Sequence, residues 1–333
     1  MRIVITGGHG FIGTALWREL ARTGRFGGEP VEQIVLLDRV ARPTDPIDPA
    51  GGPVVTTLEG DLADTVTQAF AEQVDVLFHL ASAVSAECEA DLDLGLDVNL
   101  DGTRAVLQAC RAQREADGRP ARLIFSSSVD VYGADPAQPM PDTVAETTLP
   151  IPRSSYGAQK FACETLIADY TRRRLVDGRV ARLMTVAVRP GAPNKAASSF
   201  VSGIVREPLA GVPTVCPVRT DLELAIASPR TTIAGLLTLA QAPRGDGPGE
   251  LIGALPVNLP ALTVTVQQML DALERAGGQS ARARAGLAEE PAIDAIVRSW
   301  PSRFDNARAA SLGIRPDADI DEIISQYISD HGR

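Results

Sequence analysis

The chain has 333 residues, enough for a large cofactor domain and a smaller lobe. It is 44% hydrophobic and 22% charged, as in an ordinary globular protein, and its net charge of -10 disfavours nucleic acid or an anionic membrane as a partner. The four cysteines lack metal or disulfide spacing, and we see neither a secretory signal nor a membrane-length apolar run, so we expect buried reduced thiols, no metal and a cytoplasmic protein.

Short β-branched runs alternate with helical stretches over residues 1–190, which predicts an α/β fold with a doubly wound parallel sheet. The runs do not alternate cleanly between apolar and polar residues, as expected for strands covered by helices on both faces. The predicted strands are Arg2–Thr6, Gln33–Asp38, Val54–Glu59, Val76–His79, Arg122–Ser126 and Ala181–Val188, and the helices between them include Ile12–Thr23, Asp97–Ala116 and Ser155–Arg174.

The composition changes after Arg189-Pro190-Gly191, where proline and glycine become frequent. Only short helical stretches follow, separated by loops, and this indicates a smaller C-terminal lobe. The predicted helices of the lobe are Ala197–Leu209, Thr231–Ala240, Thr265–Ala276 and Ile320–Ser329.

The first predicted strand runs into a glycine turn with the spacing GxxGxxG, and a predicted helix follows. In this context Gly7 permits a tight turn, Gly10 lets a pyrophosphate approach the backbone, and Gly13 lets the helix pack closely on the sheet. The pyrophosphate then lies at the helix N-terminus, where backbone N–H groups point at it. We interpret His9 as a loop residue of the turn and not as a ligand. The expected dinucleotide contacts of the turn are Gly7, Gly10, Phe11, Ile12 and Gly13.

A carboxylate at the end of the second strand is an independent signal for the same cofactor. Asp38 stands 25 residues after Gly13, where it can accept hydrogen bonds from both hydroxyls of the adenosine ribose. A carboxylate in that place repels the 2′-phosphate of NADP, so the sequence favours NAD. Arg39 beside it can contact the cofactor and soften this preference.

Tyr156 and Lys160 lie four residues apart at the start of a predicted helix and therefore share one face. A phenol has a pKa of about 10, and a nearby ammonium group lowers it. Tyr156 can then take a proton from a substrate alcohol while hydride leaves for the nicotinamide. Ser154 or Ser155 is expected to cap this helix, and Gly178 is expected to end it.

A serine-rich stretch, Ser126–Gly133, follows a buried strand shortly before this helix. Doubly wound sheets bind their ligands at the C-terminal ends of strands. A serine hydroxyl there can donate a hydrogen bond to the reacting oxygen and stabilise it in the transition state. We predict that Ser128 is catalytic and that Ser126 contacts the cofactor or the substrate.

Taken together, these motifs resemble those of the extended short-chain dehydrogenases/reductases, a family that includes NAD-dependent epimerases and dehydratases. The resemblance implies a Rossmann sheet, bound NAD and a homodimer formed through the helices that match Asp97–Ala116 and Ser155–Arg174. The matching motifs, in the order of the family, are Thr6–Gly13, Asp38, Asp61-Leu62, Phe78–Ala81, Val98-Asn99, Ser126–Gly133, Tyr156–Lys160 and Arg189–Gly191.

The resemblance also implies roles for residues that the bare pattern does not single out. Asp61 and Leu62 would hold the adenine end of the cofactor, and Ala81 and Ser82 would line it. Asn99 would support the strand that bears the active site, and we also expect it to contact the cofactor. The remaining expected cofactor contacts are Ser126, Tyr156, Lys160 and Pro190. Of these, Lys160 would bind the nicotinamide ribose.

The region after the Arg-Pro pair bears on the substrate. Family members that act on sugar nucleotides usually carry an Asn and a Tyr-Gly-Pro there, and this chain departs from that pattern. It is similar instead to the D-erythronate dehydrogenase subfamily, which implies NAD-dependent oxidation of D-erythronate at C2 to 2-oxo-tetronate (2-dehydro-D-erythronate). The stretches that carry this likeness are Val84–Asp91, Pro190–Phe200, Ala227–Arg230, Phe304–Ala309 and Leu312-Gly313.

A small polyol acid needs one guanidinium group for its carboxylate and a few polar groups for its alcohols. Asn194, Ser198 and Ser199 can serve the alcohols. Either Arg206 or Arg230 can bind the carboxylate, and the sequence does not decide between them. The expected substrate contacts are Ser82, Ser128, Tyr156, Asn194, Ser199, Arg206 and Arg230.

We expect residues 1–190 and about 228–252 to form the NAD-binding domain, and residues 191–227 and 253–333 to form the smaller substrate-binding lobe. Two alternatives to a dehydrogenase remain open. A nucleotide-sugar epimerase or dehydratase would keep its NAD bound and release no NADH. A non-catalytic dinucleotide sensor would need the glycine turn but not Tyr156, Lys160 and Ser128, whose joint presence argues against it.

Overall fold

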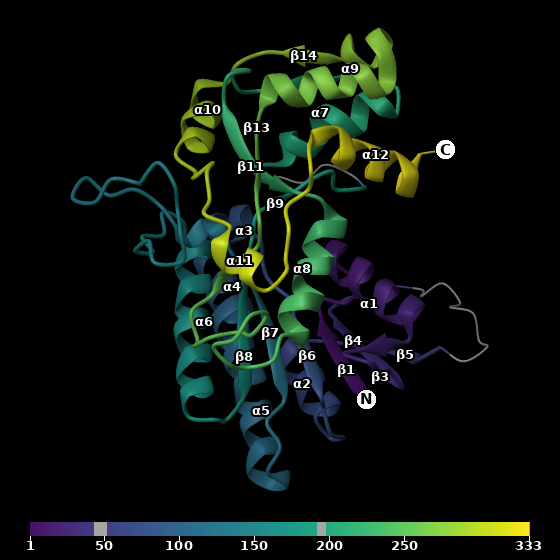
Figure 1. Ribbon diagram of the computed structural model, residues 1–333, viewed down its shortest axis with the longest axis vertical. Coiled ribbons are helices and arrows are strands. Elements are labelled where there is room, and N and C mark those ends of the chain that lie inside the picture. The colour runs from purple at the N-terminus through teal and green to yellow at the C-terminus, as the bar shows by residue number, and fades with distance from the viewer. Residues whose placement is uncertain (43–51, 192–197, 333) are drawn as a thin grey trace. The chain divides into compact units, whose positions relative to one another are not determined.

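The computed structural model describes residues 1–42, 52–191 and 198–332 (Figure 1). The chain forms two compact units. Unit 1 comprises Met1–Ser128, Ser154–Arg182 and Leu236–Val257, and unit 2 comprises Val129–Arg153, Leu183–Gly235 and Asn258–Arg333. Unit 2 thus includes Val129–Arg153, a segment within the residues that we expected in the NAD-binding domain.

A seven-stranded sheet with the order β12-β8-β7-β6-β1-β4-β5 forms the centre of unit 1 (Figure 1). The neighbours from β7 to β5 are paired in parallel, which confirms the doubly wound Rossmann-type sheet. The strands are β1 (Arg2–Thr6), β4 (Gln33–Asp38), β5 (Val54–Glu59), β6 (Val76–His79), β7 (Arg122–Ser128), β8 (Asp177–Leu183) and β12 (Val257–Asn258).

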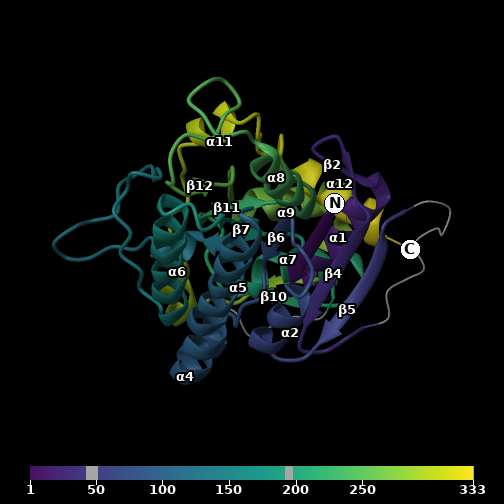
Figure 2. The ribbon, with the colours of Figure 1, turned by 90° about the horizontal axis from the view of Figure 1, so that it is seen from below.

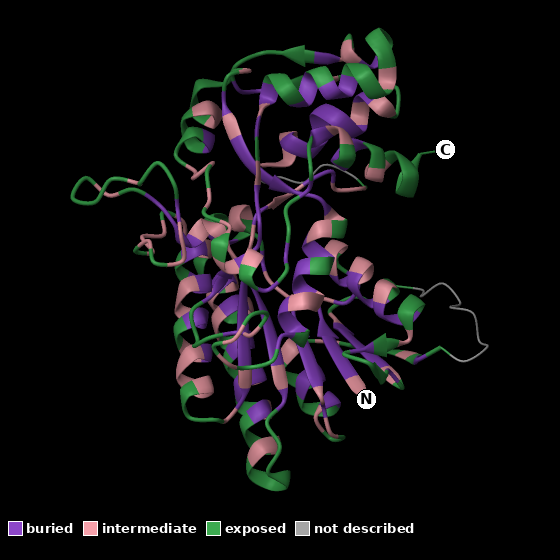
Figure 3. Ribbon diagram, in the orientation of Figure 1, coloured by how far each residue is buried: buried purple, intermediate pink, exposed green. Residues whose placement is uncertain are grey.

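Three helices lie side by side along one face of this sheet: α2 (Leu62–Ala69), α5 (Gly102–Asp117) and α6 (Ser155–Arg172) (Figure 2). Their apolar residues pack on strand side chains such as Val35 and Leu123 in one buried cluster. The inner strands β1, β4, β6 and β7 are buried almost throughout (Figure 3), as their apolar runs predicted, whereas the edge strand β5 has no buried residue.

The first four predicted strands have the predicted bounds, the fifth extends two residues further to Ser128, and the last one differs more. Instead of one strand over Ala181–Val188, β8 begins at Asp177 and ends at Leu183, and a separate strand β9 covers Thr185–Val186. The early start was missed because Asp177 and Arg179 look like loop residues. In the structure the Arg179 Nη2 atom lies 2.9 Å from the Asp177 carboxylate, and this ion pair lets charged residues enter a buried strand.

The end of α6 corrects a second expectation. Gly178 does not stop this helix, because it lies within β8. The helix ends at Arg172, and Arg174 takes the left-handed conformation, with φ 59°, that usually falls to glycine. At the other end Ser154 is the cap, and its Oγ accepts a hydrogen bond of 2.9 Å from the Gly157 N–H.

The predicted helix Asp97–Ala116 is not a regular α-helix. A π-helical segment, Leu96–Asp101, precedes α5, and a short helix α4 (Leu92–Gly95) leads into it. Single π-helical turns inside helices often mark functional sites. The apolar periodicity of the sequence carries no signal for this wider turn.

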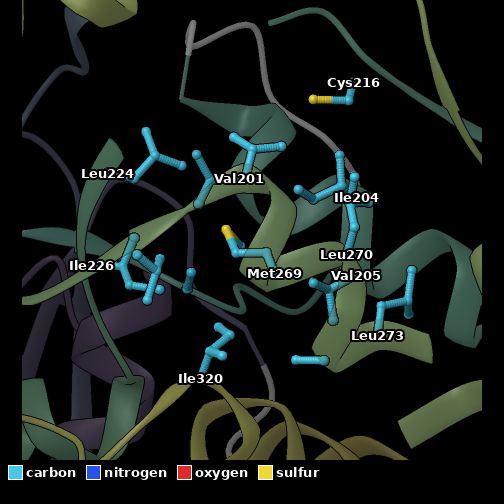
Figure 4. Close-up of a cluster of buried hydrophobic side chains, with 14 of the residues drawn as sticks. Val201, Ile204, Val205, Cys216, Leu224, Ile226, Met269, Leu270, Leu273 and Ile320 are labelled. Carbon is cyan, nitrogen blue, oxygen red and sulfur yellow. The ribbon is translucent and has the colours of Figure 1, made fainter. Parts of the chain in front are cut away.

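Unit 2 has an apolar core formed by α7 (Ser199–Leu209), α9 (Val266–Arg282) and α12 (Ile320–His331) together with the sheet β13-β11-β9 (Figure 4). The predicted helices over these ranges are confirmed within the described residues. The remaining elements are β2 (Arg25–Phe26), β3 (Glu29–Pro30), α3 (Ser85–Ala90), β10 (Thr214–Cys216), β11 (Glu223–Ala227), α8 (Pro229–Gln241), β13 (Leu262–Thr265), β14 (Ala285–Leu287), α10 (Pro291–Arg298), α11 (Ala307–Ser311) and α1 (Phe11–Thr23).

All four cysteine side chains are buried. In the described part of the chain, no helix is both long and apolar enough to cross a membrane.

Candidate active site

The glycine turn between β1 and α1 has the close backbone packing that its spacing predicts. Gly7 has φ 68°, and a Cβ atom there would lie 2.9 Å from the Ala81 nitrogen. A Cβ atom on Gly13 would lie 2.1 Å from the Gly7 oxygen, so a larger residue cannot fit. Gly10 begins α1 with no side-chain cap and no acidic residue in the first turn. This end of α1, which starts with Phe11 and Ile12, therefore fits a pyrophosphate group.

Asp38 ends β4 and is half-buried beside the glycine turn. Its Oδ2 atom accepts a hydrogen bond of 2.9 Å from the His9 N–H, and Arg39 next to it is exposed. His9 is more than a loop residue, because its side chain is buried and its Nε2 atom lies 3.1 Å from the Thr57 Oγ1. This contact was not predictable from the sequence, because Thr57 belongs to a strand 48 residues away.

The other expected cofactor contacts of unit 1 stand at the ends of β5 and β6. Asp61 is exposed just before α2, and Leu62 begins that helix. Ala81 and Ser82 follow β6 and are half-buried. The Ser82 hydroxyl lies 2.8 Å from the Oδ1 atom of Asn99.

Asn99 lies in the π-helical segment and is 3% exposed. Its Oδ1 atom accepts a hydrogen bond of 2.8 Å from the Ala83 N–H, and its Nδ2 atom donates one of 2.8 Å to the Gln159 Oε1. Asn99 thus connects the loop after β6 to α6 through Gln159, the residue that precedes Lys160.

Ser128 is the last residue of β7 and Tyr156 the second residue of α6, and both are half-buried. Lys160 is 2% exposed, and its Nζ atom donates a hydrogen bond of 2.9 Å to the Ser126 oxygen. The same Nζ atom lies 5.5 Å from the centre of the Tyr156 ring. Burial lowers the pKa of Lys160 to about 8, so the ammonium form still predominates at neutral pH and can stabilise a phenolate.

A buried ion pair beneath this strand end was not predicted. The Glu164 carboxylate accepts hydrogen bonds from the Arg182 guanidinium at 2.9 and 2.6 Å, and the Ser127 hydroxyl donates to it at 2.5 Å. Glu164 lies one helical turn beyond Lys160 in α6, and Ser127 lies between the two serines of the predicted site. This contact therefore fixes the end of β7 against the helix that bears the predicted base.

A second buried network involves His79 at the end of β6. The Thr6 hydroxyl accepts hydrogen bonds from the Leu80 and Ala81 N–H groups, so its own proton goes to the His79 Nδ1 atom 2.7 Å away. The His79 Nε2–H then faces the Thr103 Oγ1 at 3.0 Å. Complete burial lowers the pKa of His79 to about 3, so the imidazole is neutral, as this arrangement requires.

The contacts expected after residue 189, namely the cofactor contact Pro190 and several substrate contacts, belong to unit 2. Pro190 and Ser199 are half-buried, and Asn194 lies outside the described residues. Arg206 is buried in α7, where its Nη1 atom donates a hydrogen bond of 2.6 Å to the Arg189 oxygen.

The two arginine candidates both have carboxylate partners within unit 2. The Arg206 Nη2 atom lies 2.5 Å from a Glu207 oxygen. Arg230 is exposed at the start of α8 and forms an ion pair with Asp330. To bind either arginine, a substrate carboxylate would have to share that arginine with its present carboxylate partner or displace the partner.

Comparison with known proteins shows which family the chain belongs to. Residues 3–222 match the model of the NAD dependent epimerase/dehydratase family. The chain belongs to this family. Like other members of the epimerase/dehydratase family it is an NAD-dependent oxidoreductase, and the glycine turn and Asp38 of unit 1 fit its cofactor.

Two curated family members are similar over their full length. D-erythronate dehydrogenase of Cupriavidus necator is 43% identical, with 100% of this chain and 99% of the relative covered. D-erythronate dehydrogenase of Haemophilus influenzae is 39% identical, with 98% and 99% covered. A crystal structure described as a nucleoside-diphosphate-sugar epimerase from Agrobacterium tumefaciens has a TM-score of 0.90 and 36% identity, and it covers 99% of this chain and 94% of that one.

Proposed function

We propose that the protein oxidises D-erythronate at C2 to 2-oxo-tetronate (2-dehydro-D-erythronate), with NAD as the acceptor. The observation that carries this proposal is the 43% identity to a D-erythronate dehydrogenase over the whole chain. The arrangement of Ser128, Tyr156 and Lys160 in unit 1 is consistent with oxidation of an alcohol, because it combines a hydroxyl donor, a phenol and a buried ammonium group.

In this mechanism NAD, when bound, accepts the hydride that leaves C2. The phenolate of Tyr156 takes the proton of the C2 hydroxyl, and the Ser128 hydroxyl donates a hydrogen bond to the same oxygen. The Lys160 ammonium, held by its bond to the Ser126 oxygen, stabilises the phenolate. The electron pair of the C2–H bond leaves with the hydride, and the O–H electron pair forms the second bond of the new carbonyl group.

We further propose that Asn194 and Ser199 bind the substrate hydroxyls, and that Arg206 or Arg230 binds its carboxylate. The two arginines can be separated by substituting each with lysine, which keeps the charge but loses bidentate geometry. Replacement of the arginine that binds the carboxylate should raise the KM for D-erythronate. Replacement of the other arginine should leave this KM unchanged.

The proposal is tested by absorbance at the NADH band with NAD and a panel of free aldonates. We expect reduction with D-erythronate well above its stereoisomers. Absence of NADH across the panel, with NAD bound, would reject the proposal.

The role of Tyr156 is tested by Tyr156→Phe. We expect turnover to fall about 10²–10⁴-fold, because the variant keeps the ring but loses the proton acceptor. NAD affinity, measured by calorimetry, should remain close to that of the parent protein. Tyr170→Phe makes the same change near the end of α6 and serves as the control. Unchanged turnover in Tyr156→Phe would exclude Tyr156 as the base.

A nucleotide-sugar epimerase is the second candidate, because the Agrobacterium structure at 36% identity carries that description. An epimerase would convert a nucleotide sugar with no net release of NADH. Nucleotide sugars therefore belong in the same panel, with chromatography of the products. Epimerised product without NADH would favour this candidate.

We also propose that the enzyme forms a homodimer, as the family resemblance implies, and that it acts in the cytoplasm. Light scattering of the purified protein gives the mass directly, and a monomer at working concentration would contradict the dimer.

A further inference from the structure

His9 has contacts that its place in a glycine turn does not require. Its side chain is buried, although Gly10 beside it is exposed. The His9 Nε2 atom lies 3.1 Å from the Thr57 Oγ1 atom of β5. The imidazole thus extends from the turn after β1 to the outermost strand of the parallel series β1-β4-β5.

The neighbouring residues show how the turn is supported. A Cβ atom on Gly8 would lie 2.7 Å from the Leu36 Cβ, so the turn lies directly on the face of β4 that bears Leu36. Thr57 is the register partner of Leu36 on β5 and faces the same side. His9 and Gly8 therefore fix the turn on two adjacent strands.

The backbone of the same residue holds the carboxylate that selects the cofactor. The His9 N–H donates a hydrogen bond of 2.9 Å to the Asp38 Oδ2, and the Val40 N–H lies 3.5 Å from the Oδ1. The His9 bond is the shorter and better formed of the two. The orientation of the Asp38 carboxylate therefore depends on where the His9 peptide group lies.

We propose that His9 is a positioning residue for cofactor selection. Its bond to Thr57 fixes the peptide group that orients the Asp38 carboxylate toward the adenosine ribose. The inference rests on the proposed role of Asp38 as the ribose ligand. Without the bond to Thr57, the turn and the carboxylate gain freedom, NAD loses affinity, and the repulsion of a 2′-phosphate weakens.

The test is calorimetric measurement of the Kd for NAD and for NADP in the absence of substrate. The variants are His9→Ala, Thr57→Val, their double variant, and Asp38→Ala. The matched control is Thr56→Val, which removes a hydroxyl from the opposite face of the same strand, because adjacent strand residues face opposite sides. The full-length protein is used throughout.

We expect His9→Ala and Thr57→Val each to raise the Kd for NAD about 3- to 10-fold, the effect of one hydrogen bond, and to raise the Kd for NADP less. The double variant should bind NAD no more weakly than the weaker single variant, because both changes remove one contact. Thr56→Val should match the parent protein. If His9→Ala does not fold, the shift of the NAD to NADP ratio in Thr57→Val decides alone.

Two results would overturn the inference. One is an unchanged ratio of NAD to NADP affinity in Thr57→Val, and the other is a double variant whose losses add. Asp38→Ala separates this failure from that of the underlying assignment. If Asp38→Ala leaves the ratio unchanged, Asp38 is not the ribose ligand, whereas a changed ratio there with an unchanged ratio in Thr57→Val rejects only the role of His9.

Discussion

Two buried regions of this molecule are held together by different forces. The first, which we term the polar layer, lies in unit 1 behind the end of β7 and consists of Ser127, His79, Asn99, Lys160, Glu164 and Arg182. The second is the apolar core of unit 2, to which α7, α9 and α12 contribute buried residues such as Ile204, Leu270 and Ile320 (Figure 4).

The two regions have different structural roles. Burial of charged groups costs free energy, and a well-packed apolar core of the same volume is often more stable. In unit 1 the polar side chains instead fix particular atoms at fixed distances, for example Lys160 Nζ at 2.9 Å from the Ser126 oxygen. The polar layer therefore supplies positional accuracy, and the apolar core supplies stability through burial and close packing of side chains.

The largest effect is expected in the polar layer, from Glu164→Ala. This change leaves the Arg182 guanidinium buried without its partner, and we expect the free energy of unfolding to fall by about 3–5 kcal/mol in urea titrations. The double variant Glu164→Leu with Arg182→Met removes both charges and should recover much of the loss. A loss that the double variant fails to recover would mean that packing, and not the unpaired charge, dominates.

In the apolar core, Leu270→Ala should lower the free energy of unfolding by about 2–5 kcal/mol, because it leaves a cavity between helices. Urea titration measures the loss. Leu270→Met keeps the volume and should cost under about 1.5 kcal/mol. Equal losses for the two variants would show that the core is not tightly packed around this residue.

Mild acid should lower the free energy of unfolding through the polar layer and not through the apolar core. His79 has a folded-state pKa of about 3 against about 6.5 when unfolded, so the unfolded chain binds the extra proton between these values. Its contribution to stability is complete above pH 6.5 and falls by about 1.4 kcal/mol for each pH unit below it. Urea titrations between pH 6.5 and 4.5 should show this slope in Leu270→Ala as in the parent protein. His79→Asn should reduce it, and an undiminished slope there would assign the proton elsewhere.

The smallest effect is expected at an exposed ion pair. Arg275 of α9 and Asp321 of α12 form two hydrogen bonds of 2.7 Å at the surface of unit 2. Water screens such pairs, so Arg275→Ala should leave the urea midpoint nearly unchanged. A loss as large as that of Leu270→Ala would show that surface charge, not the core, holds these two helices together.

The sequence predicted those parts of the site that depend on local spacing. Gly7 and Gly13 were identifiable because only glycine fits their backbone conformation and close packing. Tyr156 and Lys160 were identifiable because four residues correspond to about one helical turn. The parallel sheet was predictable because short apolar runs alternate with helical stretches along the chain.

The contacts between distant segments were not predictable in this way. Glu164 and Arg182 each look like surface residues, and only the pairing of α6 with β8 brings them together. The same holds for His9 and Thr57, whose contact depends on the register of β5. The π-helical segment around Asn99 was missed because its apolar spacing does not differ enough from that of an α-helix.

The chain of hydrogen bonds through His79 has a direction as well as a composition. Two backbone N–H groups fix the proton of Thr6, which fixes the tautomer of His79, which in turn leaves the Thr103 hydroxyl to donate to the Asn99 oxygen at 2.6 Å. Only one assignment of protons satisfies all of these groups. These hydrogen bonds hold the Thr6, His79 and Thr103 side chains in one orientation, so the dipoles around the predicted site are aligned before any ligand binds.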